Sequence, residues 1–143
     1  NEHAQVSAYG VFPVADGEVI LAPANNGLFR RLLSLLGRDD LLDEAKFASN
    51  ETRLANRAEL DAIIAAETRK WQLADLLAHC AKEGIPAGSV NTIEGVFAEP
   101  QVQARGMRID PGGIPGVRSP FTFSDAELAL GEPSPILGGN QDD

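Results

Sequence analysis

Residues 9–22 read YGVFPVADGEVILA, and this stretch decides how the fold begins. Its two β-prone runs, Tyr9–Phe12 and Glu18–Ala22, lie on either side of Ala15, Asp16 and Gly17. Because tight hairpin turns need residues that tolerate a positive φ, we expect Gly17 to adopt one. The stretch therefore predicts an antiparallel β-hairpin near the N-terminus.

A helical pattern follows the hairpin. Arg30, Arg31 and Ser34 fall on one face of the predicted helix, where we expect the two arginines to be solvated. Gly37 then ends the helix as a C-terminal cap. The opposite face is a broad apolar arc made of Leu28, Phe29, Leu32, Leu33, Leu35 and Leu36.

Two more helices are expected before residue 86. Asn56 and Glu59 have the spacing of a capping pair at a helix start, ahead of an apolar stripe. A second apolar repeat stops at Gly84, just before Pro86. This repeat has i, i+3, i+4, i+7 spacing and consists of Leu73, Leu76, Leu77 and Cys80. Two packed helices are therefore predicted.

The remaining elements are short. We expect a strand over Ala87–Val90, a turn capped by Thr92 and another turn that opens at Pro100. Beyond them, two strands joined through residues 111–116 are expected, Met107–Ile109 and Val117–Phe123. The glycines of that loop fit a plain hairpin connection.

Together these elements predict an α+β fold with an N-terminal β-hairpin, a cluster of helices in the middle and a C-terminal β element. We expect one small domain over residues 1–130. Residues 131–143, GEPSPILGGNQDD, are rich in Pro, Gly and acid, which is typical of a tail that orders only against another domain.

Charge and composition exclude several classes of partner. The 143-residue chain has a net charge of −9, and its basic residues are scattered, so no basic stripe could neutralise phosphates. We therefore expect neither nucleic acid nor an anionic membrane as a partner. No apolar run approaches the roughly 18 residues of a membrane span.

The cysteine and methionine content bears on location and on completeness. Cys80 is the only cysteine, which favours a reducing, cytoplasmic compartment. The chain starts at Asn1 and its only methionine is Met107. We interpret the sequence as a piece of a larger protein.

No constellation of catalytic or metal-binding residues stands out in the sequence. With His3 and His79 as the only histidines, three or four metal ligands are not available, so no metal is expected. His79 and Cys80 are neighbours that diverge by about 100° on a helix, so we expect exposed His79 and buried Cys80. Ser89 lacks the setting of a nucleophile elbow.

Two pairs of polar residues are interpreted differently, one pair as structural and the other as functional. Asp39 and Asp40 are interpreted as helix caps. Asn25 and Asn26 occupy a strand-to-helix transition, where backbone N–H groups can meet an anion.

The ordered series of segments resembles the C-terminal part of the class III CoA-transferases, also called the CaiB/BaiF family, which includes formyl-CoA transferase, carnitine CoA-transferase and α-methylacyl-CoA racemase. The resemblance extends from about Ala8 to Asp143 but covers only the last third or so of a family member. The matching segments are Ala8–Pro13 with Asp16 and Gly17; Phe29–Leu32 and Gly37; Phe47–Asn50 with Arg53, Asn56 and Arg57; Gly84–Gly88; Pro100–Val102; Ala104–Met107; Ser119–Phe121 with Phe123 and Ser124; and Leu137 and Gly138.

The resemblance implies a function for the parent protein and a limited role for this chain. In the family, a larger N-terminal domain binds CoA and carries an aspartate that attacks the acyl-CoA thioester to form a mixed anhydride. No position in residues 1–143 matches that aspartate. We therefore expect no catalytic residue here, no cofactor other than coenzyme A as a substrate, and a small domain that shields the anhydride from water.

The resemblance also indicates which residues line the pocket. We expect Ser7, Ala8, Tyr9 and Gly10 to approach the substrate, followed by Asn25 and Asn26. Ala8 replaces a proline and Val14 a threonine that are common in the family. Asn140 and Gln141 stand where a His and a Thr are usual before Asp142 and Asp143.

Two alternatives remain open at this stage. One is the small domain of a 2-methylacyl-CoA racemase, which the lack of an acid near Gly10 disfavours. The other is a free-standing binding module without catalytic activity. The parent enzyme is expected to be an interlocked homodimer acting on acyl-CoA and carboxylic acids, and the fragment a monomer or weak dimer.

Overall fold

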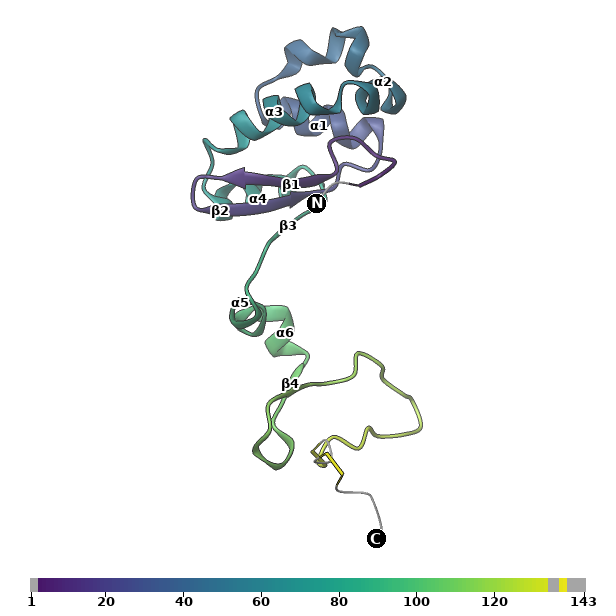
Figure 1. Ribbon diagram of the computed structural model, residues 1–143, viewed down its shortest axis with the longest axis vertical. Coiled ribbons are helices and arrows are strands. Elements are labelled where there is room, and N and C mark those ends of the chain that lie inside the picture. Colours follow the sequence, from purple (N-terminus) through teal and green to yellow (C-terminus); the bar gives the residue numbers. More distant parts are fainter. Residues whose placement is uncertain (1–2, 134–136, 139–143) are drawn as a thin grey trace. The chain divides into compact units, whose positions relative to one another are not determined.

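The computed structural model describes residues 3–133 and 137–138 (Figure 1). The chain divides into two compact units, Asn1–Val90 and Asn91–Asp143, and each is described by itself. The tail expected over residues 131–143 falls largely outside the described residues, and the domain boundary at residue 130 stays a prediction.

A three-stranded antiparallel sheet organises the first unit. Strands β1 (Gly10–Val14), β2 (Gly17–Leu21) and β3 (Ala87–Ser89) lie in the order β1-β2-β3. Phe12 pairs with Val19, and Val19 also pairs with Ser89 across β2. The predicted hairpin, the short strand after Pro86 and the α+β class are confirmed.

The turn between β1 and β2 differs from the prediction at Gly17. Val14 pairs with Gly17, so Ala15 and Asp16 form the turn. None of Ala15, Asp16 and Gly17 has a positive φ. A type I turn has negative φ at both central positions and favours glycine in the fourth, which is where Gly17 lies. Asp16 has a second role, because its Oδ1 accepts a hydrogen bond of 2.8 Å from the backbone N–H of Leu73.

Four helices complete the first unit: α1 (Asn26–Leu35), α2 (Asn50–Ala55), α3 (Arg57–Thr68) and α4 (Leu73–Lys82). Gly37 and Gly84 follow α1 and α4 with φ of 70° and 64°. In both cases the next residue donates its N–H back into the helix, Arg38 to Leu33 O and Ile85 to Cys80 O, each at 2.8 Å. This is the Schellman arrangement, and it confirms both predicted helix ends.

The predicted capping pair, Asn56 with Glu59, does not make the expected hydrogen bonds at the start of α3. Asn56 occupies the N-cap position of α3, but its Nδ2 donates to Thr52 O at 2.9 Å because α2 ends directly in front of it. Glu59 turns outward and accepts a hydrogen bond of 2.6 Å from Lys46. Helix α2, which the sequence analysis did not predict, starts instead with a capping box between Ser49 and Thr52.

The acidic pair after α1 is also not a cap. Arg38 is the N-cap residue of a 3₁₀ helix over Asp39–Asp43, and both acids lie in its first turn. Asp40 pairs with Arg38 at 2.8 Å, and this hydrogen bond holds the pKa of the Asp40 carboxyl below its usual range. A second 3₁₀ turn, Ala45–Phe47, leads to α2.

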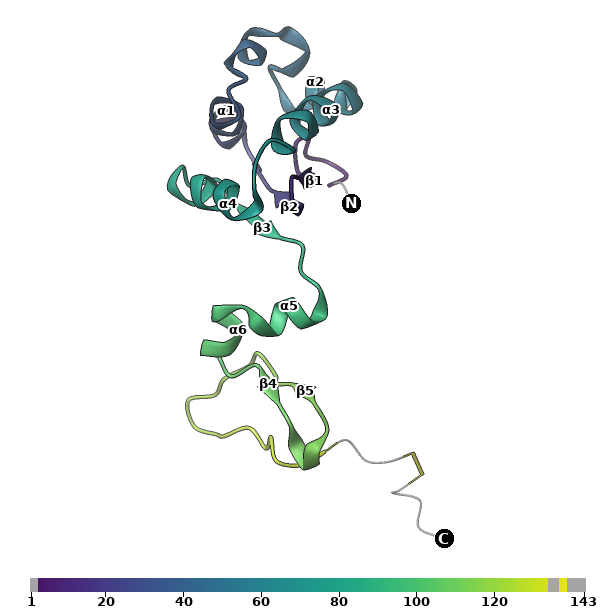
Figure 2. The same cartoon turned by 90° about the vertical axis from the view of Figure 1, so that its left-hand side faces the viewer.

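The core of the first unit lies between the sheet and its helices. Helix α3 packs against β1, and α4 packs against β2, β3 and α1 (Figures 1 and 2). The apolar arc of α1 is buried at Phe29, Leu32 and Leu33. Fully buried partners from the other elements are Val19, Leu21, Leu60, Ile64 and Leu76.

The second unit is built from short elements. Helices α5 (Ile93–Ala98) and α6 (Pro100–Ala104) precede strands β4 (Arg108–Ile109) and β5 (Gly116–Val117), which pair antiparallel. Thr92 caps α5, as predicted, by accepting from the Gly95 N–H at 3.1 Å.

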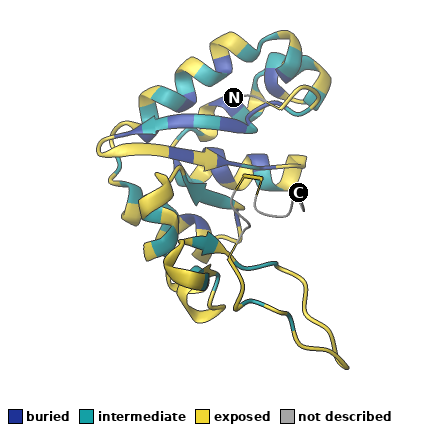
Figure 3. Ribbon diagram, turned by 60° about the horizontal axis from the view of Figure 1, so that its bottom comes forward, coloured by how far each residue is buried: buried dark blue, intermediate teal, exposed yellow. Residues whose placement is uncertain are grey.

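The strand expected over Val117–Phe123 is wrong in its extent, because it ends at Val117. Pro120 contributes no N–H to a ladder, which removes a pairing donor from this segment. None of the described residues of this unit is buried (Figure 3). Large apolar side chains are exposed instead, including Ile93 at 82% and Phe121 at 70%.

Candidate functional site

The segment Ser7–Gly10, which we call the approach segment, leads into β1 and is hydrogen-bonded to α2. Ser7, Ala8 and Gly10 are buried, and Tyr9 is half-buried. The Ser7 N–H donates to Asn50 Oδ1 at 3.1 Å, and the Ser7 hydroxyl donates to the carbonyl of Arg53 at 3.4 Å. The predicted site residues are therefore anchored by a helix more than forty residues later in the chain.

Ala8 has an unusual backbone conformation. Its φ is 67°, and it is the one described non-glycine residue with a positive φ. This left-handed conformation costs an L-residue about 1–2 kcal/mol and persists only where surrounding contacts enforce it. Proline fixes φ near −65°, so a proline at this position would not fit the observed backbone. Strain of this kind is concentrated at functional sites.

Asn25 and Asn26 begin helix α1 and use their side chains within the protein. Asn25 Oδ1 accepts from the N–H of Leu28 at 2.9 Å, as an N-cap residue does. Asn26 Oδ1 accepts from Arg53 Nη2 at 2.6 Å. The two asparagines are exposed, and their side-chain oxygens are already engaged within the protein.

Arg53 joins the two predicted site segments. It is only 3% exposed, its Nη1 donates to Phe47 O at 2.9 Å, and its guanidinium lies 4.2 Å from the centroid of the Phe29 ring. In residues 3–133 and 137–138, no carboxylate forms an ion pair with it. Burial lowers the pKa of this guanidinium from its ordinary value. A small cavity of about 60 Å³ lies beside it and is lined also by Asn26 and Arg30.

Arg53 belongs to one of the segments that resemble the family, together with Phe47–Asn50, but it was not predicted to be a site residue. No local signal indicates its role, because it lies in a short polar helix, Asn50–Ala55, where a basic residue is normally solvated. What the sequence could not reveal is that this side chain turns inward between Phe29 and Asn26.

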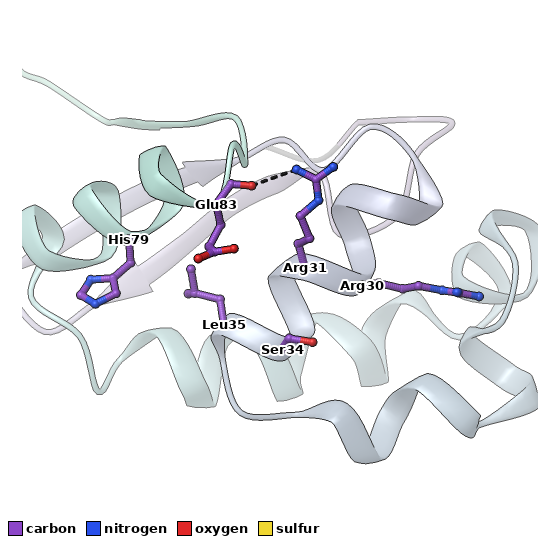
Figure 4. A pocket seen from close by; sticks show the side chains of 6 residues that line it. All are labelled: Arg30, Arg31, Ser34, Leu35, His79 and Glu83. Carbon is purple, nitrogen blue, oxygen red and sulfur yellow. Dashed lines mark hydrogen bonds between the residues drawn. The ribbon is translucent and has the colours of Figure 1, made fainter.

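A wider groove of about 420 Å³ lies between α1 and α4 (Figure 4). Arg31 Nη1 donates to the carbonyl of Glu83 at 2.9 Å, while Arg30 points away from Glu83. Both arginines are exposed, as predicted. His79 lines the same groove, and its Nδ1 carries a proton because it lies 2.8 Å from the carbonyl of Asp75, which can only accept.

The thiol next to His79 in the sequence is not an activated nucleophile. Cys80, next to His79, is 1% exposed, and burial raises the pKa of its thiol. The predicted arrangement of exposed His79 and buried Cys80 is confirmed. No three His, Cys, Asp or Glu side chains of the described residues gather as metal ligands. No helix in the same part of the chain has the length and apolarity needed to cross a membrane.

Curated relatives of the chain are CoA-transferases. It is 46% identical, over 99% of its length, to the succinate–glutarate CoA-transferase of Agrobacterium fabrum. It is 31% identical, over 95% of its length, to the succinyl-CoA:glutarate CoA-transferase of Mus musculus. The chain spans only 36% and 32% of these two relatives.

Two solved structures have a fold similar to that of this chain. A CaiB/BaiF family protein from Brucella suis has a TM-score of 0.81 and 47% identity, covering 96% of this chain and 36% of that one. The fold of the protein Rv3272 from Mycobacterium tuberculosis is also similar, with a TM-score of 0.81 at 21% identity. The model of CoA-transferase family III matches residues 1–141, and the chain belongs to that family.

Proposed function

We propose that this chain is the small domain of a CoA-transferase that moves CoA between two dicarboxylic acids, of the succinate and glutarate type. The single observation that carries the proposal is the 46% identity to the succinate–glutarate CoA-transferase over nearly the whole chain. Other relatives are named for succinyl-CoA with D-citramalate and for acetyl-CoA with oxalate, and these acceptors too carry two carboxyl groups.

The proposed chemistry divides between this chain and an upstream domain. An aspartate of that domain attacks the thioester carbonyl, the C–S bond breaks, CoA leaves as its thiolate, and the acyl group becomes a mixed anhydride. The thiolate next attacks the aspartyl carbonyl of this anhydride and releases the donor acid, and the acceptor carboxylate attacks the resulting aspartyl thioester and expels the thiolate again. The thiolate then takes the acyl group from this second anhydride and frees the aspartate, so both anhydrides must be kept from water. We assign this shielding, and one wall of the pocket, to Ser7–Gly10 with Asn25 and Asn26.

The exposed apolar surface of the second unit supports the same division. Ile93, Val117, Phe121 and Phe123 are each at least 60% exposed, and none of the unit's described residues is buried. A unit without a core of its own is expected to order against a larger surface. We propose that the upstream domain supplies that surface, and that the parent protein is cytoplasmic and homodimeric.

The test compares the native polypeptide that contains this sequence with residues 1–143 alone. Incubation of the native polypeptide with succinyl-CoA and glutarate should yield glutaryl-CoA and succinate, detected by mass spectrometry, whereas residues 1–143 should yield none. Turnover by residues 1–143 alone would overturn the assignment of the nucleophile upstream. Exchange of the α-proton of a 2-methylacyl-CoA, without CoA transfer, would show a racemase instead. A native polypeptide of about 15.2 kDa would indicate a free-standing module.

A further inference from the structure

We propose that Arg53 is a positioning residue that fixes the approach segment, Ser7–Gly10, relative to the start of α1. The inference rests on the proposed function, because it assigns a role to both segments in the pocket. It goes beyond that function because Arg53 lies outside the proposed pocket wall and determines the relative position of the two segments that form the wall.

The guanidinium of Arg53 makes three contacts, two of them with α1 and one with the 3₁₀ turn Ala45–Phe47. It donates to the side chain of Asn26 at 2.6 Å and to the carbonyl of Phe47 at 2.9 Å, and it stacks over Phe29 at 4.2 Å. A planar guanidinium can satisfy two separate acceptors and an aromatic face together, whereas a lysine ammonium on a flexible stem cannot. The hydrogen bond to Asn26 holds its side-chain oxygen toward Arg53.

The same helix holds the approach segment on its other side. Asn50 accepts from the Ser7 N–H at 3.1 Å and donates to Gln5 O at 2.8 Å. The Arg53 carbonyl accepts from the Ser7 hydroxyl at 3.4 Å, and Arg57 donates to Val6 O at 3.0 Å. One short helix, Asn50–Ala55 with Arg57 following, therefore contacts both segments of the proposed wall.

The energetics of Arg53 favour a role in geometry over a role in stability alone. A buried cation without a carboxylate partner has a desolvation cost that its hydrogen bonds must offset, and its Nε has no hydrogen-bond partner. Directly beside its Ser7 contact lies Ala8, whose positive φ needs enforcing contacts. Asn50 and the backbone carbonyl of Arg53 supply such contacts at Ser7, the residue before Ala8.

The test uses the native polypeptide with Arg53→Lys, and two control variants. Arg69→Lys makes the same exchange on an exposed residue of the same unit, and Ile64→Val removes a methylene from the core without touching the wall. For each protein we would measure Tm, kcat and KM for the acceptor acid, and amide hydrogen exchange of residues 3–12 and 23–30.

Arg53→Lys should lower kcat/KM for the acceptor roughly tenfold to a hundredfold, the range that a misplacement of about 1 Å produces. Ile64→Val should lower Tm comparably while changing kcat/KM less than about twofold, and Arg69→Lys should change neither. Amide exchange in both segments should accelerate roughly tenfold in Arg53→Lys alone, as expected for losing a hydrogen bond to a charged group. Equal kinetic effects in Arg53→Lys and Ile64→Val would overturn the proposal and leave Arg53 a merely structural residue.

The exchange measurement separates this inference from the proposed function. If the unmodified polypeptide transfers no CoA, the proposed function fails, but the two segments must still loosen together in Arg53→Lys. If transfer is normal and only one segment loosens, the proposed function stands and the positioning role is refuted.

Discussion

Replacing Ala8 by proline tests the strained approach to β1 directly. The observed φ of 67° is inaccessible to proline, whose ring fixes φ near −65°, so the chain must leave its path at this point. The change would pull Ser7 away from Asn50 and from the Arg53 carbonyl, which it contacts at 3.1 and 3.4 Å. Losing these two hydrogen bonds and leaving a buried serine unpaired should cost about 2–4 kcal/mol.

Ala8→Gly is the matched control at the same position. Glycine relieves a left-handed strain of about 1–2 kcal/mol. It also loses a buried methyl group, about 0.8 kcal/mol, and increases the entropy of the unfolded chain by about 0.5–1 kcal/mol. These terms nearly cancel, so Ala8→Gly should lie within about 1 kcal/mol of the unmodified chain.

Urea denaturation followed by the fluorescence of Trp71, the single tryptophan, measures both variants. Since the free energy of unfolding falls linearly with urea, the midpoints give the difference if the slopes agree. Should Ala8→Pro unfold at the same midpoint as Ala8→Gly, the positive φ at Ala8 and the strain argument built on it would both be wrong.

Three further predictions follow from other contacts. Asp16→Ala should cost about 1 kcal/mol, since it removes the side chain that caps α4 at Leu73, and Asp16→Asn should recover most of the loss in the same urea assay. Burial raises the pKa of the Cys80 thiol, so as the pH rises above about 8.5 the thiol loses its proton in the unfolded chain before it does so in the folded chain. The free energy of unfolding should therefore decline between about pH 8.5 and the folded pKa, and Cys80→Ala should abolish that decline. Limited proteolysis of residues 1–143 should cut within residues 91–133 well before residues 3–90, because none of the described residues beyond 90 is buried; equal cleavage rates in both units would contradict this.

The approach segment shows where sequence reasoning about the site succeeded and where it stopped. Ser7–Gly10 and Asn25–Asn26 were expected at the pocket from the family resemblance, and the structure brings both to Arg53. Their role in binding substrate stays a prediction. Arg53 itself was not predicted to be a site residue, because a basic residue in a polar helix is ordinarily solvated. Nothing in the local sequence indicates that its side chain turns inward.

The sequence by itself determined the features that depend on neighbours along the chain. The hairpin, the helix ends at Gly37 and Gly84 and the cap at Thr92 all involve contacts within a few residues. Such contacts form at small cost in loop entropy, so composition and spacing are enough to predict them.

Only the tertiary structure decided the features that join distant segments. The pairing of β3 with β2, the cap that Asp16 provides to α4 and the inward turn of Arg53 each connect residues far apart in sequence. The positive φ of Ala8 belongs to this group as well, because helix α2 must be folded before it can hold Ser7. Local preference would place alanine at negative φ, and the hydrogen bonds that hold Ser7 to α2 override that preference.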